Sequence, residues 1–177
     1  MAGSLIKIDE EIVTSAVASV TLGGADWDSS YDVYMVKMND VQTDDAGITY
    51  VQARVTTSGT ADTTANYDSA DKNLRTDTTF SNSAFTNQTF AYISNAINNS
   101  AQSTHNNILY LFNFNNASEY SFATFEGLEW RYNNNNLFGR QGGFVHTVAQ
   151  SCDGINIFTS AGNIDNGKFS LYGLKKD

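Results

Sequence analysis

Apolar and polar residues alternate with a period of two along most of this chain, and this pattern predicts β-strands. Segment 107–114, for example, places Ile108 and Tyr110 on one face and Leu109 and Leu111 on the other. No segment shows a convincing amphipathic helical pattern. The alternating segments are 4–8, 15–22, 31–38, 48–55, 107–114, 120–132, 142–148, 154–159 and 167–174.

Short polar segments separate these runs, which is typical of an antiparallel arrangement of about eight to ten strands. Proline is absent, so Gly, Asn, Asp and Ser must form the turns. Residues 44–47 are predicted to be a hairpin turn, and Gly127 predicts a bulge or bend. We therefore expect an all-β fold, an antiparallel β-sandwich or jelly roll, that forms one domain over residues 1–177.

Residues 56–89 break the pattern. Ser, Thr, Asn, Asp and Ala dominate this stretch, and its apolar residues, such as Tyr67 and Phe85, are scattered. We expect a long polar excursion from the sheet, with short helical turns around 67–74. Segment 90–97 fits a short strand and a short helix equally well.

The net charge is −9, from 10 basic and 19 acidic residues. Binding to a phosphate backbone needs clustered Lys and Arg, and no such cluster exists, so we expect no nucleic-acid partner. No apolar run approaches the roughly 18–20 residues of a membrane span. The first residues lack the basic segment and apolar stretch of a secretory signal. We expect neither membrane insertion nor secretion.

Candidate metal ligands and nucleophiles are few. Cys152, His105 and His146 are the only Cys and His residues, too few for a four-ligand structural zinc site. We therefore expect no metal or cofactor. Cys152 is predicted to be an inert thiol in an exposed turn, His105 to lie in a polar loop, and His146 to be a buried or interface residue within a strand.

Clustered carboxylates invite a search for cation sites. Residues 9–11, Asp-Glu-Glu, are predicted to form a solvated turn. Residues 26–28, with Asp32, faintly resemble a calcium loop but lack its Gly and terminal Glu. The pattern favours a connecting turn at this position.

A glycosidase needs two carboxylates about 5–10 Å apart. Glu119, Glu126 and Glu129 lie on or beside the run that also carries Trp130 and Tyr132, and aromatic residues beside a carboxylate can line a sugar groove. Nothing in the sequence fixes a second carboxylate opposite Glu129. We therefore expect no catalytic residue, and an enzyme is the least favoured interpretation.

The C-terminal segment 157–175 reads I-F-T-S-A-G-N-I-D-N-G-K-F-S-L-Y-G-L-K. It resembles the ending F-x-S-x-G-N-I-x-x-G-x-F-x-L-Y-G-L/I-K of small virion proteins of tailed phages, especially marine, cyanophage-type phages. Segment 28–34, D-S-S-Y-D-V-Y, is similar to an S-Y-D-x-Y stretch in the same proteins. The resemblance covers both ends of the chain but not its middle. It implies a role at the virion surface and no catalytic residues.

On this basis we expect a structural protein on the exterior of a phage virion, made in the host cytoplasm. It would be a capsid decoration or cement protein, or part of a tail fibre or other tail appendage, that self-assembles and contacts other virion proteins. Aromatic residues are favoured at such contacts, and a symmetric homo-oligomer is expected. The alternative is a carbohydrate-binding or receptor-binding module that contacts a host surface glycan. The candidate contact residues are Tyr31, Tyr34, Trp130 and Tyr132.

Overall fold

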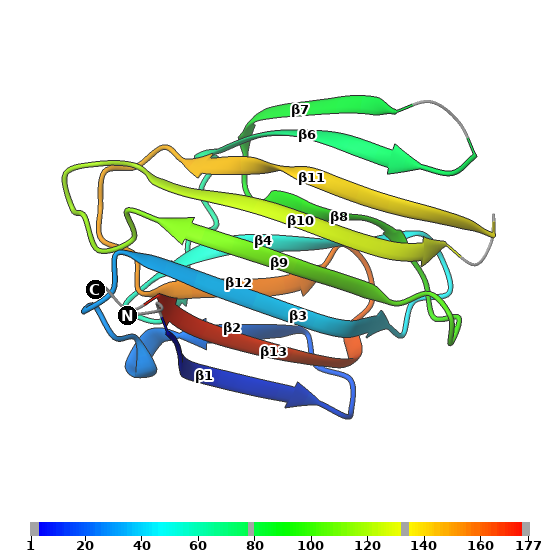
Figure 1. Cartoon of the computed structure of the whole chain (residues 1–177), viewed down its shortest axis with the longest axis horizontal. Helices are drawn as coiled ribbons and strands as arrows, with labels where there is room; N and C mark the ends of the chain where they lie inside the picture. Colours follow the sequence, from blue (N-terminus) through cyan, green and yellow to red (C-terminus); the bar gives the residue numbers. More distant parts are fainter. Residues whose placement is uncertain (1–3, 78–79, 132–134, 175–177) are drawn as a thin grey trace.

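The computed structural model describes residues 4–77, 80–131 and 135–174 (Figure 1). These residues form thirteen β-strands and one short 3₁₀ helix, η1 (Gly24–Asp26). The predicted all-β sandwich is confirmed, although the strands outnumber the eight to ten that we expected. Within the described ranges, no helix is long and apolar enough to cross a bilayer.

Eight antiparallel strands form the larger sheet, which runs in Figure 1 from β1 at the bottom to β7 at the top. Their order across the sheet is β1 (Leu5–Val13), β13 (Ile164–Leu174), β3 (Val33–Thr43), β9 (His105–Phe112), β10 (Ser121–Arg131), β11 (Asn136–His146), β6 (Tyr67–Arg75) and β7 (Ser81–Gln88).

The smaller sheet packs against one face of the larger sheet. Its path is β2 (Ser19–Gly23), β12 (Gly154–Thr159), β4 (Thr49–Thr57) and β5 (Thr60–Ala61), and β8 (Ala91–Ile97) also pairs with β4. Because β3 and β4 belong to different sheets, residues 44–47 connect the two layers, and the predicted hairpin turn is wrong. Asp45 Oδ1 accepts a hydrogen bond from the Gly47 N–H at 2.7 Å and fixes this connection.

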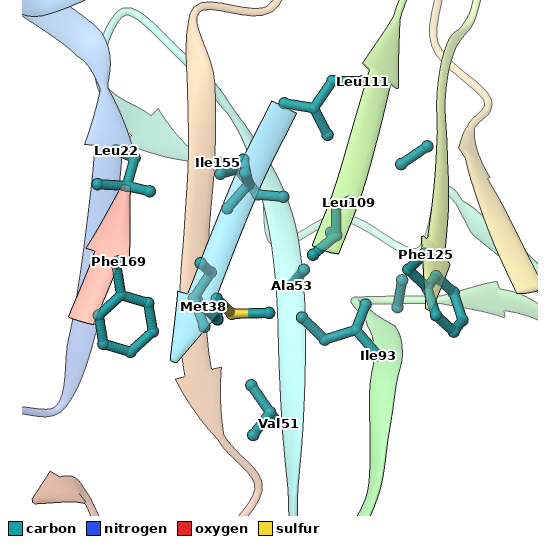
Figure 2. Close-up of a cluster of buried hydrophobic side chains, with 14 of the residues drawn as sticks. Leu22, Met38, Val51, Ala53, Ile93, Leu109, Leu111, Phe125, Ile155 and Phe169 are labelled. Atoms are coloured by element: carbon teal, nitrogen blue, oxygen red, sulfur yellow. The ribbon is translucent and has the colours of Figure 1, made fainter. Parts of the chain in front are cut away.

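The core lies between the two sheets, where every second residue of each strand points inward. Figure 2 shows Met38, Leu109 and Leu111 of the larger sheet beside Val51 and Ile155 of the smaller one. All five are fully buried. Full burial of a side chain of this size contributes about 1.5–3 kcal/mol, so this layer is the main source of stability.

The predicted excursion at 56–89 is wrong. Strands β5, β6 and β7 occupy this stretch, and β6 and β7 extend the larger sheet. Burial still alternates along β6, but three of the inward residues are Ser69, Asp71 and Asn73, so the period of two carries no hydropathy signal. The ambiguous segment 90–97 contains strand β8.

Two further local predictions are wrong. Gly127 makes no bulge, because β10 keeps an unbroken register with both neighbours. A Cβ atom there would lie 2.8 Å from Asn107 Nδ2 and from His105 Cε1, so close packing requires the glycine. Residues 9–11 lie within β1 rather than in a turn, and Glu10 pairs with Lys168 at 3.2 Å.

Candidate functional site

Tyr34, predicted to be an exposed contact residue, belongs to the core. It is fully buried, its ring stacks on Trp27 at 3.9 Å, and its hydroxyl donates to the Asp28 carbonyl at 2.7 Å. Asn115 Nδ2 donates to the same hydroxyl at 2.7 Å. Burial raises the pKa of Tyr34 above its ordinary value. The prediction of an exposed contact is therefore wrong for this residue.

The other three predicted contact residues differ in position. Tyr31 is half-buried and lies against the backbone of Gly173, where a Cβ atom would come within 2.3 Å of its ring. Trp130 is exposed on the outer side of β10. Tyr132 lies outside the described residues.

Trp130 belongs to a row of large apolar side chains on the outer side of the larger sheet, which we call the open face. This row, the apolar ridge, follows β9 and β10, and its members are 38–45% exposed. Large apolar patches on a surface usually mark a contact site. The ridge consists of Ile108, Tyr110, Phe122, Leu128 and Trp130.

Small residues follow the ridge across the open face. The pairing register places Gly143 of β11, Ala70 of β6 and Ala84 of β7 in one row beside Thr124 of β10. They line an apolar hollow of about 430 Å³, which we call the trough. The open face therefore carries two exposed apolar areas side by side, the ridge on β9 and β10 and the trough on β11, β6 and β7.

Charges on the central strands of the open face balance. Lys37 and Lys72 point outward from β3 and β6, as do Glu126 from β10 and Asp68 from β6, with Asp40 at the rim. The chain as a whole carries −9. This face is thus less repulsive toward an acidic protein than the rest of the surface.

A second feature lies between the sheets, at a break in strand β8. This strand pairs with β4 at both its ends, but the register shifts between them, so that residues 93–95 lie opposite Val51 alone. The Ser94 hydroxyl accepts from the Val51 N–H at 2.7 Å. The remaining backbone groups of segment 93–95 therefore need other partners inside the protein.

Buried polar side chains of the larger sheet supply these partners. Asn107 donates to the Ile93 carbonyl at 2.6 Å, and Arg140 donates to the Ser94 carbonyl at 2.7 Å. Glu129 accepts from the Asn95 N–H at 2.9 Å. Asp71 pairs with Arg140 at 2.6 Å and His105 with Glu129 at 2.8 Å. We call these five side chains of the larger sheet the polar layer.

The polar layer borders a cleft at the edge of the sandwich. In Figure 1, β6 and β7 extend beyond β8, so the smaller sheet leaves part of their inner side uncovered. The resulting cleft has a volume of about 310 Å³ and is lined by aromatic and polar side chains. Its residues include Asn73 of β6, Ser83 and Phe85 of β7, Tyr92 and Asn95 of β8, and Arg140 of β11. We call it the β7–β8 cleft.

The carboxylates considered for sugar cleavage do not share a site. Glu126 and Glu129 are three residues apart in β10 and point to opposite faces of the sheet. Glu129 is buried in the polar layer, and Glu119 accepts from Asn113 in a loop. Among the described residues, no three His, Cys, Asp or Glu side chains are placed to hold a metal ion.

The histidines and the cysteine are all buried. His105 is the first residue of β9, so its predicted place in a polar loop is wrong. His146 is buried, as predicted, and contacts Asp62 at 2.8 Å. Cys152 is also buried, not exposed as predicted, and burial raises the pKa of its thiol. A buried protonated thiol is a poor nucleophile.

No protein-family model and no curated protein matches the sequence. Among solved structures, the chain is similar to the CBM2 module of the evolved Dit protein of Lactobacillus casei BL23 phage J-1. The identity is 10% and the TM-score 0.26, over 90% of this chain and 69% of that chain. A TM-score this low does not transfer a role from one protein to the other.

Proposed function

We propose that the chain is a structural protein on the exterior of a phage virion that acts by assembly rather than catalysis. The observation that carries the assembly role is the open face, where an apolar ridge and an apolar trough lie exposed side by side. The resemblance of segment 157–175 to endings of phage virion proteins supports the location.

The partner that fits the open face is a second copy of the same chain. A two-fold axis parallel to the strands, between the ridge and the trough, would place the ridge of each copy over the trough of the other. Both halves of the contact would then be apolar, as in the cores of homodimer interfaces.

Charge favours the same partner. Two chains of charge −9 repel each other over most of their surfaces. The central open face carries two lysines and two carboxylates, so contact there meets less repulsion than the net charge of the chain implies. Contact through any more acidic surface would cost additional electrostatic free energy.

Sedimentation velocity tests the assembly. The wild-type protein should form a dimer that Ala70→Arg disrupts, because the new side chain fills the trough. Ala84→Arg, on edge strand β7, tests the same trough if Ala70→Arg fails to fold. Ile48→Arg, at an exposed apolar residue outside the strands, should leave the dimer intact. A wild-type monomer at about 100 μM, well above ordinary specific affinities, would exclude the second copy as the partner.

Mass spectrometry of purified particles tests the location. The chain should be present in many copies in virions of the phage that encodes it. Its absence from the particles would refute the virion role. Its presence in particles together with a monomer in solution would assign the open face to another capsid or tail protein.

A carbohydrate-binding or receptor-binding role is the second candidate function. The observation that favours it is the β7–β8 cleft, which combines aromatic rings with amide, hydroxyl and guanidinium groups. Small-molecule sites characteristically combine an aromatic lining with a few convergent polar groups. The residues that line this cleft share only Phe85 with those that line the trough of the open face, so the two roles are compatible in one molecule.

A further inference from the structure

We propose that the β7–β8 cleft binds an uncharged saccharide, a mono- or disaccharide unit of a larger glycan, an assignment that rests on the second candidate function. The cleft is a consequence of unequal sheet widths. Strand β7 is an edge strand whose inner side is not covered by a strand of the smaller sheet. The inward residues of β6 and β7 are accordingly polar or aromatic rather than aliphatic.

Aromatic rings form one wall of the cleft. Tyr92 is at their centre, with Phe85 at 5.0 Å and Tyr50 at 5.6 Å between ring centroids. All three residues are half-buried and line the cleft. The face of an aromatic ring is electronegative and attracts the weakly positive C–H groups on one face of a pyranose ring. Such a wall suits a pyranose ring, which carries hydroxyl groups at its edge and C–H groups on at least one face.

Hydrogen-bonding groups face this wall. Asn73, which is buried, donates to the Ser83 hydroxyl at 3.1 Å, and both side chains line the cleft. Asn95 Nδ2 donates to the carbonyl of Gly139, which holds the side-chain amide in place. Fixed amides and hydroxyls both donate and accept, which matches the hydroxyl groups at the edge of a sugar. A purely apolar ligand would displace water from these groups without using their remaining hydrogen-bonding capacity.

The charges in the cleft are already balanced, and this selects the ligand class. Arg140 pairs with buried Asp71 at 2.6 Å, and Arg75 donates to the two carboxylate oxygens of Asp77 at 2.9 and 2.8 Å. Neither guanidinium is therefore available as an unneutralised cation for an acidic sugar. An anionic ligand would have to compete with an existing carboxylate. Binding should favour neutral sugars over uronates.

One side-chain donor of Arg140, a residue that lines the cleft, has no hydrogen-bond partner among the described residues. Arg140 is 4% exposed and lies over the Tyr92 ring at 5.3 Å. Its two terminal nitrogens donate to Ser94 and Asp71, but its Nε has no hydrogen-bond partner among the described residues. Buried N–H groups are nearly always paired. A ligand oxygen that enters beside Tyr92 and displaces its ring slightly would give the Arg140 Nε–H the acceptor that it lacks.

The size of the cleft limits the ligand. At about 310 Å³, it is at the lower end of the range for small-molecule sites. This volume admits one or two sugar rings rather than a long oligosaccharide. The bound unit is therefore expected to be the end or a side branch of a glycan.

Amide chemical shifts of the ¹⁵N-labelled full-length protein test the proposal. The probes are maltose, lactose, mannobiose and chitobiose as uncharged sugars, and digalacturonate as the matched acidic sugar. At least one uncharged sugar should shift the amides of Ser83, Tyr92 and Asn95, whereas digalacturonate should not. No shift of these amides with any uncharged probe would overturn the proposal, and so would equal binding of digalacturonate.

Two variants locate the site. Tyr92→Ala should weaken binding of the active sugar about tenfold, which corresponds to the loss of one aromatic contact. Tyr110→Ala, which removes a ring from the open face instead, should leave binding unchanged. The opposite pattern would place the sugar on the open face and contradict the cleft assignment.

Ser83→Trp, on edge strand β7, fills the cleft and should abolish binding even if Tyr92→Ala fails to fold. Binding that survives a folded Ser83→Trp protein would overturn the proposal. Sedimentation and particle mass spectrometry do not depend on the cleft. A failed titration therefore removes the saccharide site without affecting the virion role.

Discussion

Different interactions stabilise the two ends of the sandwich. Where β13, β3 and the C-terminal half of β9 cover β2, β12 and β4, the inward side chains are almost all aliphatic or aromatic, such as Val36, Leu111 and Ile157. Where β11 and β6 cover β8, the inward side chains include the buried polar residues Arg140 and Asp71. We call these regions the apolar half and the polar half.

The difference follows from the irregular pairing of β8. In the apolar half, the strand ladders satisfy the backbone, so the side chains between the sheets can be apolar. In the polar half, segment 93–95 leaves the ladder, and its backbone groups would be unsatisfied against an apolar layer. Asn107, Arg140 and Glu129 satisfy them from the opposite sheet. Hydrogen bonds between the sheets therefore contribute to the polar half, whereas the apolar half is held together by the burial of apolar surface.

The largest predicted effect concerns the buried ion pair of the polar half. Asp71→Asn removes the carboxylate and leaves the Arg140 guanidinium buried without a counter-charge. We expect a loss of about 3–5 kcal/mol in the free energy of unfolding, measured by urea titration at pH 7. Asp77→Asn breaks the half-exposed pair with Arg75 and should cost less than about 1 kcal/mol. Equal losses for the two variants would contradict a structural role for the polar layer.

A smaller effect is expected at alkaline pH, from the buried tyrosines. Tyr67 donates to the Asp62 carbonyl at 2.9 Å and accepts from the Val55 N–H, and burial raises its pKa above the ordinary value of about 10. The unfolded chain loses this proton first, so the associated stability is present below pH 10 and is lost as pH rises further. Each such tyrosine contributes a slope of about 1.4 kcal/mol per pH unit.

Urea midpoints between pH 8 and 12 measure this slope. Tyr67→Phe should reduce it, and Tyr110→Phe, at the ridge, is the matched control. If the slope is the same in Tyr67→Phe as in the wild type, then Tyr67 does not link folding to alkaline pH.

The same contrast explains what could be predicted from the sequence. In the apolar half, inward positions are apolar, so alternation revealed strands such as 107–114 and 154–159. In β6, the inward positions include Asp71 and Asn73, so an equally regular strand was predicted to be an irregular excursion. These two inward residues of β6 are polar because they belong to the polar layer or line the β7–β8 cleft, and both depend on how far the smaller sheet extends. The local sequence of β6 does not show how far the smaller sheet extends.

Candidate contact residues were predictable only through strand parity. Tyr34 shares its parity with Val36 and Met38 and lies with them on the core side of β3. Trp130 shares its parity with Leu128 on the outer side of β10 and is indeed exposed. Glu129 has the opposite parity and is buried. The part of the ridge on β10 could thus be predicted from one strand, but the trough needs residues from three strands and could not be predicted.

The smallest predicted effect on the free energy of unfolding concerns a residue of the open face, which lies outside both halves of the interior. Leu128→Ala removes a ridge side chain that is 45% exposed, so the unfolding free energy of the monomer should change by no more than about 0.5 kcal/mol. If the open face binds a second copy, the effect should grow with protein concentration, because dimerisation adds stability by mass action. Thermal unfolding across a range of concentrations measures both terms. A loss that is large at every concentration would mean that Leu128 stabilises the monomer, and a loss that stays small would remove it from the dimer contact.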